Sequence, residues 1–397
     1  MVSPSILAHN AFVQATVTNF FFSLGLNGFV LLPLYIHALG GTEIEIGLVM
    51  GLYSTVGIIC QPLVGPLIDV VGRRPFMILG VALVLGSTVL ATFTGSIAAL
   101  AVVRVIQGLG FSAFFVASFS YVVDIVPREE RGWALGIYGV SGFVSTALAP
   151  LYGEWIIRRW GFPPLFVLSA VLTAVAGAFV LRLREIRPGG SVPVRAAVLV
   201  RGGIEDVFHR HMLVTIFFGL GSGTIFAFLP TFAESLGVRT LSLFYTAYAG
   251  AAVAVRVFGG RWIDTYGRRA VIVPSMFVQA AATALLAVLG LAVTRTSQTP
   301  VLPVLFVAGM MSGGAHGFLY PGLAALVTDL TPDVRRAAVV GVFSAMFLVG
   351  QAVGAFLFGY VTHALGYGPM WLALTALLLT GALLSMRLAR LPTEAPA

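Results

Sequence analysis

Long apolar runs, each about the length of a membrane-spanning helix, constrain the fold of this chain more than any other feature of its sequence. A bilayer core of about 30 Å needs about 20 apolar residues per helix. The second run opens on a capping box formed by Thr42 and Glu45. We therefore predict an all-α membrane protein of twelve transmembrane helices, at residues 10–35, 44–68, 76–96, 98–123, 133–156, 163–184, 212–235, 241–263, 270–292, 301–328, 337–361 and 367–387.

The composition excludes several classes of soluble protein. Charged residues make up 10% of the chain and hydrophobic residues 58%, whereas an average soluble domain is about 25% charged. The mean hydropathy is +0.99, which disfavours a soluble enzyme, a disordered chain and a nucleic-acid-binding domain. We attribute the net charge of +8 to basic loops on the cytoplasmic side of a membrane. The lipid bilayer is therefore the predicted partner, and no nucleic acid is expected.

The arginines predict how the chain is oriented. The sequence has no lysine, so all 23 basic residues are arginine. With the N-terminus inside, 17 arginines are predicted on the cytoplasmic side, and only four on the outer side, namely Arg158, Arg159, Arg239 and Arg295. Because basic loops stay on the cytoplasmic side, we expect a multi-pass protein of the cell inner (plasma) membrane with both termini cytoplasmic.

The longest polar interruption divides the chain into two halves. Residues 185–211 contain Pro188, Gly189, Gly190 and Ser191, which is typical of a linker. We predict an N-terminal six-helix bundle at 1–184, a cytoplasmic linker at 185–211 and a C-terminal six-helix bundle at 212–397. A monomer is expected.

The two halves carry the same motifs in the same order. The stretch Gly65-Pro-Leu-Ile-Asp69-Val-Val-Gly72-Arg73-Arg74 recurs as Gly260-Arg-Trp-Ile-Asp264-Thr-Tyr-Gly267-Arg268-Arg269, 195 residues later. Two spans further on, Asp124, Pro127, Arg131 and Gly136 recur as Asp329, Pro332, Arg336 and Gly341, 205 residues later. A repeat whose motifs fall on one membrane side predicts parallel halves, related by a pseudo-two-fold axis along the membrane normal.

These motifs resemble those of the major facilitator superfamily. The G-x-x-x-D-x-x-G-R-R signature lies between spans 2 and 3 and again between spans 8 and 9, and the resemblance covers the whole chain. It implies a secondary transporter that works by alternating access, with its substrate site between the halves.

The repeated motif also implies a conformational latch. An aspartate at the end of a span can accept from the N–H groups at a neighbouring helix N-terminus, where the helix dipole favours an anion. The resemblance implies that Asp69 meets the helix that begins near Arg336, and that Asp264 faces the helix that begins near Gly132. Alternatively, the neighbouring arginines only set the topology. The latch residues predicted in full are Gly65, Asp69, Gly72, Arg73, Arg74, Asp124, Arg131, Asp264, Gly267, Arg268, Arg269, Asp329 and Arg336.

Arg104 is a functional candidate because an ionisable residue inside a span is costly. It lies in Arg104-Val-Ile-Gln107-Gly108-Leu-Gly110, which resembles a family motif associated with proton transfer in proton-coupled members. The alternative is an arginine that extends toward the outer interface. Gln107 is a candidate cavity contact.

Arg256 and Glu154 are further candidates inside predicted spans. Arg256 lies in span 8, and the alternative is that it joins the cytoplasmic charge network. Glu154 follows Ala149-Pro150-Leu-Tyr-Gly153, a partial match to an antiporter motif that ends G-P-x-x-G-G. A carboxylate in a low-dielectric setting suits a proton carrier. The alternative is a pair with Arg158 one turn later.

The remaining candidates are neutral or titratable polar residues within spans. His316 lies in the middle of span 10 and could titrate or bind substrate. For each of these candidates, the alternative is a packing role inside the bundle. They are His316, Asn27, Gln61 and Gln351.

Taken together, the sequence predicts a proton-coupled transporter most like the drug and metabolite efflux branch of the family. Its small-molecule substrate would be lipophilic or amphipathic, because the lining is apolar and aromatic. Alternatives are an uptake symporter or uniporter for a small metabolite, or a transporter-like membrane sensor. No catalytic or metal-binding set and no Walker A lysine is present, so we expect neither an enzyme nor a cofactor.

Overall fold

The computed structural model of the chain is helical throughout the part it describes, which comprises residues 10–127, 130–185, 210–292, 301–329 and 336–388, apart from a few side chains in these ranges. In the first half, one spanning segment is made of three consecutive helices, and five others are continuous. They are α2 (Asn10–Asn27), η1 (Gly28–Leu31) and α3 (Leu32–Ala38), then α4 (Glu43–Val71), α5 (Arg73–Phe93), α6 (Ile97–Ile125), α7 (Arg131–Trp160) and α8 (Phe162–Arg182).

The second half repeats this order of spanning helices. Its helices are α10 (Arg210–Ser235), α11 (Ser242–Phe258), the short α12 (Trp262–Thr265), α13 (Arg268–Ala292), α14 (Val301–Asp329), α15 (Arg336–Leu365) and α16 (Tyr367–Ser385). In the described residues, eleven helical segments are long and apolar enough to cross a membrane. The predicted all-α membrane fold is confirmed.

The eighth predicted span is shorter than the sequence suggested. We predicted residues 241–263, but α11 ends at Phe258 and α12 begins only at Trp262. The break falls at Gly259 and Gly260, and glycine is a poor helix former. The 17 residues of α11 extend about 25 Å at 1.5 Å per residue, so this helix alone is shorter than a typical bilayer core.

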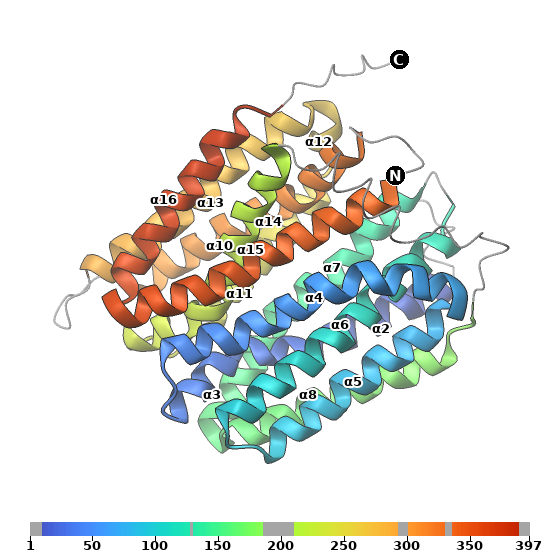
Figure 1. The fold of residues 1–397 in the computed structure, drawn as a ribbon, viewed down its shortest axis with the longest axis horizontal. Coiled ribbons are helices and arrows are strands. Elements are labelled where there is room, and N and C mark those ends of the chain that lie inside the picture. The colour runs from blue at the N-terminus through green and yellow to red at the C-terminus, as the bar shows by residue number, and fades with distance from the viewer. Residues whose placement is uncertain (1–9, 128–129, 186–209, 293–300, 330–335, 389–397) are drawn as a thin grey trace.

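The two halves lie side by side, and α2 begins toward the same end of the bundle at which α16 ends (Figure 1). The helices of the second half occupy the upper part of the view and those of the first half the lower part. We call the end where α2 begins and α16 ends the proximal end. The opposite end, where α3 ends and α4 begins, is the distal end.

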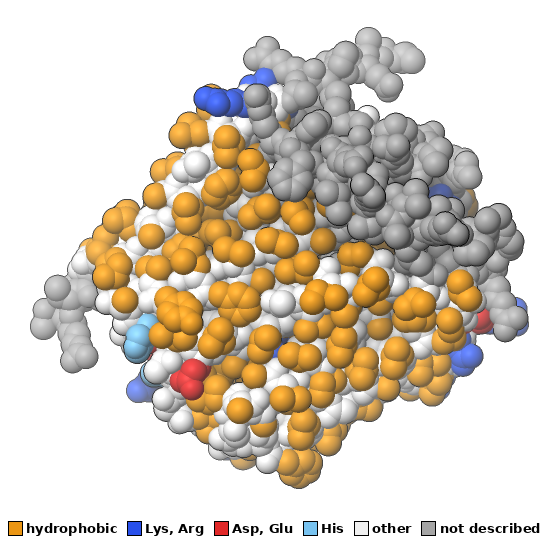
Figure 2. Space-filling view, in the orientation of Figure 1, with side chains coloured by type: hydrophobic (Ala, Val, Ile, Leu, Met, Phe, Trp, Pro, Cys, Tyr) orange, Lys and Arg blue, Asp and Glu red, His pale blue; other side chains and the backbone are white. Residues whose placement is uncertain are grey.

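The outer surface suits a lipid environment. Figure 2 shows a face covered largely by hydrophobic side chains, with charged side chains gathered toward its ends. Large apolar residues such as Phe93, Val171 and Val288 are exposed along the helices. Soluble monomers rarely expose so large an apolar surface to water.

The hydrophobic cores show how the halves meet. One core contains residues of both halves from the distal region, including Leu31 and Phe166 from the first half and Phe232 and Trp371 from the second. Toward the proximal end, each half has a core of its own. The two halves therefore share one hydrophobic core at the distal end, whereas toward the proximal end each half packs around a core of its own.

Candidate functional site

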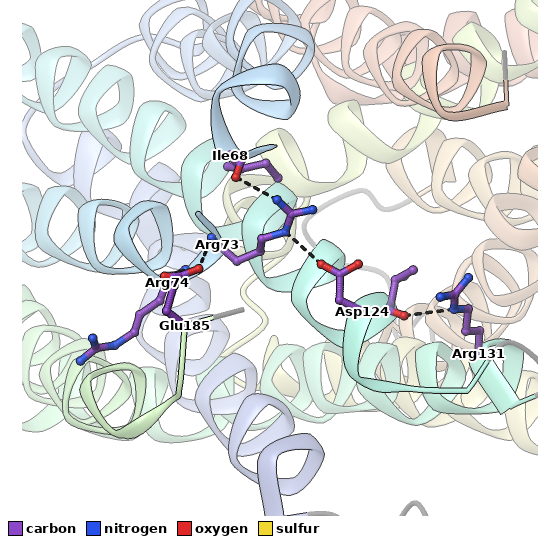
Figure 3. Close-up of polar contacts among 7 residues, drawn as sticks. Ile68, Arg73, Arg74, Asp124, Arg131 and Glu185 are labelled. Carbon is purple, nitrogen blue, oxygen red and sulfur yellow. Dashed lines mark hydrogen bonds and ion pairs between the residues drawn. The ribbon is translucent and has the colours of Figure 1, made fainter. Parts of the chain in front are cut away.

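Buried Arg73 organises the proximal end of the first half. Its Nε donates to Asp124 Oδ2 at 2.9 Å, and an amino group of the same guanidinium donates to the carbonyl oxygen of Ile68 at 2.9 Å (Figure 3). Gly72, at φ 111°, allows the turn between α4 and α5 that places Arg73 there. This arginine therefore links α5 to the ends of α4 and α6.

Glu185 completes this cluster, and the sequence analysis did not identify it. Its carboxylate accepts the backbone N–H groups of Arg73 at 2.9 Å and Arg74 at 3.1 Å (Figure 3). These are the first two residues of α5, where an anion is stabilised by the helix dipole. The signal in the sequence was an acidic residue directly after the sixth apolar run.

Two other predicted latch residues bond to backbone carbonyls. Arg74 donates to the carbonyl oxygen of Leu181 at 2.7 Å. Arg131 donates from Nε to the carbonyl oxygen of Val123 at 3.0 Å, beside Asp124 (Figure 3). Both contacts stay within the first half.

The second half repeats the two side-chain contacts of Arg73. Arg268 Nε donates to Asp329 Oδ2 at 3.0 Å, and an amino group of the same side chain donates to the carbonyl oxygen of Ile263 at 2.9 Å. Arg269 donates to the carbonyl oxygen of Met386. Gly267, at φ 85°, occupies the position of Gly72. The repeat seen in the sequence is therefore a repeat of contacts.

The predicted latch contacts between the halves involve side chains that the structure does not describe. The side chains of Asp69, Asp264 and Arg336 lie outside the described residues, so their predicted contacts with the opposite half stay predictions. A Cβ added at Gly65, one turn before Asp69, would meet nothing within 4 Å, which puts open space beside this part of α4.

At the distal end, three polar contacts join the two halves. His37 Nδ1 lies 3.0 Å from Glu234 Oε2, and His363 Nδ1 lies 3.2 Å from Glu43 Oε2. The third contact joins Glu154 of α7 to the first residue of α11. In the described residues, the charged contacts at the proximal end stay within one half.

Glu154 caps the N-terminus of α11. Its Oε1 accepts the backbone N–H of Ser242 at 3.0 Å, and its Oε2 accepts the Ser242 hydroxyl at 2.6 Å. The Arg158 guanidinium lies 3.8 Å from Oε2, so the pair considered from the sequence is also present. A carboxylate at a helix N-terminus is stabilised by the free N–H groups and by the dipole. Sequence reasoning missed Ser242 because the contact joins residues 88 positions apart.

Near the middle of the bundle, Arg256 and His316 lie in a group of aromatic rings. The Arg256 guanidinium lies over the ring of Phe143, 4.9 Å from its centroid, although Phe143 belongs to α7 of the other half. His316 Nδ1 lies 2.7 Å from the hydroxyl oxygen of Tyr248. The His316 ring also contacts Phe143 and Phe218. The sequence singled out the arginine and the histidine but not the aromatic residues that bring them together.

Arg104 forms a smaller buried cluster in the first half. Its guanidinium lies over the ring of Tyr53, 4.3 Å from the centroid, and donates to Gln107 Oε1 at 3.0 Å. The side chain is only 6% exposed, so it does not extend to the outer interface as the alternative interpretation required.

The other polar candidates have different partners. Asn27 donates to Ser145 Oγ at 3.0 Å and Thr146 Oγ1 at 3.1 Å, which ties α2 to α7 within one half. Gln351 Oε1 accepts from Ser54 Oγ at 3.2 Å, which joins α15 to α4 across the halves. Gln61 is buried in α4.

Comparison with known proteins agrees with the repeat and the fold. A family model for the Major Facilitator Superfamily matches residues 15–239 and 211–397. The staphylopine export protein of Staphylococcus aureus is 25% identical over 392 residues, which cover 96% of each chain. A crystal structure of a variant of the nucleoside transporter NupG aligns with a TM-score of 0.79 at 17% identity, covering 95% of this chain and 99% of that one. The human organic anion transporter MFSD10 aligns with a TM-score of 0.69 at 18% identity, with coverage of 95% and 99%.

Proposed function

This chain belongs to the major facilitator superfamily, and we propose that it exports a small amphipathic solute across the cell inner membrane by alternating access. The family consists of membrane transporters rather than enzymes. The observation that carries the proposal is the division of the hydrophobic core: one shared core at the distal end and two separate cores toward the proximal end. Two rigid bodies joined at one end can rock about a site between them.

The distal polar contacts are the proposed gate on one side of that site. Glu154 with Ser242, Glu43 with His363 and Glu234 with His37 each join the two halves. We assign the proximal end to the cytoplasm, since the arginines of the repeated loops gather there. The structure then corresponds to the state that opens inward, and the distal contacts must break before solute can leave on the outer side.

Coupling to protons is the second part of the proposal, and the position of Glu154 bears on how it works. Protonation of Glu154 would remove the negative charge that holds the N-terminus of α11, and so would favour opening of the distal side. A proton that drives export must instead favour the return to the inward-open state. We therefore assign Glu154 to the gate rather than to the carriage of the driving proton.

We propose that Arg104 contributes to proton coupling. Its motif resembles the proton-linked motif of the family, and among the described residues its buried Nε has no hydrogen-bond partner. A guanidinium keeps its proton at neutral pH, so Arg104 would act through its fixed charge rather than as the proton carrier.

Everted membrane vesicles provide the test of direction and coupling. A fluorescent amphipathic solute should accumulate inside everted vesicles when the vesicle interior is more acidic than the medium. Collapse of that pH gradient should abolish accumulation. The Arg104→Gln variant should lose accumulation but keep downhill exchange of solute. Accumulation by right-side-out vesicles alone would contradict export and favour the uptake alternative. Accumulation that ignores the gradient would contradict proton coupling.

A further inference from the structure

Arg256 is a half-buried cation to which the described part of the chain supplies no counter-charge. Its Nε is sealed from solvent and has no hydrogen-bond partner. In the described residues, no carboxylate contacts the guanidinium, whose neighbours are the ring of Phe143 and the backbone of α7 at Gly139. An arginine is always protonated, and a charge at membrane depth is costly unless it is paired.

The cation faces an aromatic wall that comes from both halves. Tyr320 of α14 and Tyr248, two turns before Arg256 on α11, are both close enough to interact electrostatically with the guanidinium. The wall is continued by rings around His316, which stacks on Tyr320 and meets four other rings edge-on, those of Phe143, Tyr248, Phe218 and Phe347. Phe143 is the member from the first half, so a molecule against this wall touches both bodies that must move.

From this arrangement we propose that the transported solute carries an anionic group, such as a carboxylate, that binds Arg256, and an aromatic or apolar body that lies against this wall. The inference rests on the proposed function, because it places the solute in the space between the two halves. A guanidinium presents several donors in a planar fork that matches a carboxylate. The aromatic rings offer apolar area with few rotatable bonds, so ordering them costs little entropy.

Gly139 offers a way to move the Arg256 guanidinium without removing its charge. A Cβ added there would lie 2.6 Å from an amino group of Arg256. The contact is with the end of a flexible side chain, so Gly139→Ala would displace the guanidinium from its place over Phe143 without forcing the helices apart. This variant moves the cation while keeping its charge.

The probe for the test is naphthalene-2-carboxylate, compared with the neutral naphthalene-2-carboxamide. Both are added to the full-length protein in nanodiscs made only of zwitterionic lipid, so that no anionic headgroup competes. Binding is followed by quenching of tryptophan fluorescence and by thermal stabilisation. The wild type should bind the carboxylate better than the carboxamide, and Arg256→Gln should weaken carboxylate binding about ten- to hundredfold. Gly139→Ala should weaken it in the same direction, and the carboxamide should be little affected by either change.

Arg239→Gln is the matched control, because it removes an exposed arginine of the same half and should leave binding unchanged. Anionic lipid added to the nanodiscs should not abolish the preference for the carboxylate. If it does, the cation serves a lipid headgroup and the inference is overturned. Equal binding of the two probes, equal binding by wild type and Arg256→Gln, or no carboxylate binding by the wild type at about 10 mM also overturns it. The vesicle assay with the fluorescent amphipathic solute measures export separately, so these outcomes leave the proposed function standing.

Discussion

At the scale of single residues, the two arginine clusters of the proximal end have the same contacts but different burial. The Arg73 side chain is 7% exposed, whereas its repeat partner Arg268 is 22% exposed. A charge-assisted hydrogen bond to a buried group contributes about 1.5–3 kcal/mol, whereas an exposed ion pair contributes about 1 kcal/mol or less. We therefore expect the Arg73 cluster to contribute more to the free energy of unfolding than the Arg268 cluster.

We expect Asp124→Asn to lower the free energy of unfolding by about 2 kcal/mol, because it weakens a charge-assisted hydrogen bond to the buried Arg73. Its matched control, Asp329→Asn, should lower it by about 1 kcal/mol. Both free energies can be measured in mixed micelles by titration with sodium dodecyl sulfate. Equal losses in the two variants would contradict the assignment of different roles to the two clusters.

At the scale of elements, α4 and α15 approach each other closely across the two halves. A Cβ added at Gly47 would fall against the carbonyl oxygen of Ala355 and 3.2 Å from Cα of Gly359. Both contacts are with the backbone of α15, which cannot move aside as a side chain can. Glycine at position 47 therefore sets how tightly the distal end closes.

Gly47→Ala should destabilise the protein by about 1–3 kcal/mol through overpacking, and should weaken distal closure. The control is Gly86→Ala in α5, where an added Cβ meets nothing within 4 Å. This control should be neutral or should gain up to about 1 kcal/mol from the better helix propensity of alanine. Unfolding in mixed micelles compares the two, and a stable Gly47→Ala variant would show that α4 and α15 pack more loosely than described.

The elements themselves could be predicted from the sequence, because the length of an apolar run and its capping residues are local properties. The Thr42–Glu45 capping box is formed, with the Thr42 N–H donating to Glu45 Oε2 at 2.8 Å. Contacts between elements could not be predicted in the same way. The bond of Glu154 to Ser242 depends on how the halves are rotated in one conformational state, and no pattern within either helix records that rotation.

At the scale of the whole molecule, the distal contacts and the shared core predict that the two halves must separate at this end in every transport cycle. Glu43 of α4 and His363 of α15 are a suitable pair for testing this, because their side chains meet at 3.2 Å across the halves. The chain has one cysteine, Cys60, so a Cys60→Ser background leaves introduced cysteines as the only thiols.

In that background, a short cleavable cross-link between cysteines placed by Glu43→Cys and His363→Cys should stop transport in proteoliposomes, and reduction of the link should restore it. The control pair, Tyr35→Cys and Thr94→Cys, lies within the first half, where the Tyr35 hydroxyl donates to the carbonyl oxygen of Thr94 at 2.9 Å. Since rocking moves each half as a rigid body, this second link should leave transport unchanged. Transport at the uncross-linked rate with the distal pair locked would mean that the halves do not separate there, and alternating access about this end would have to be abandoned.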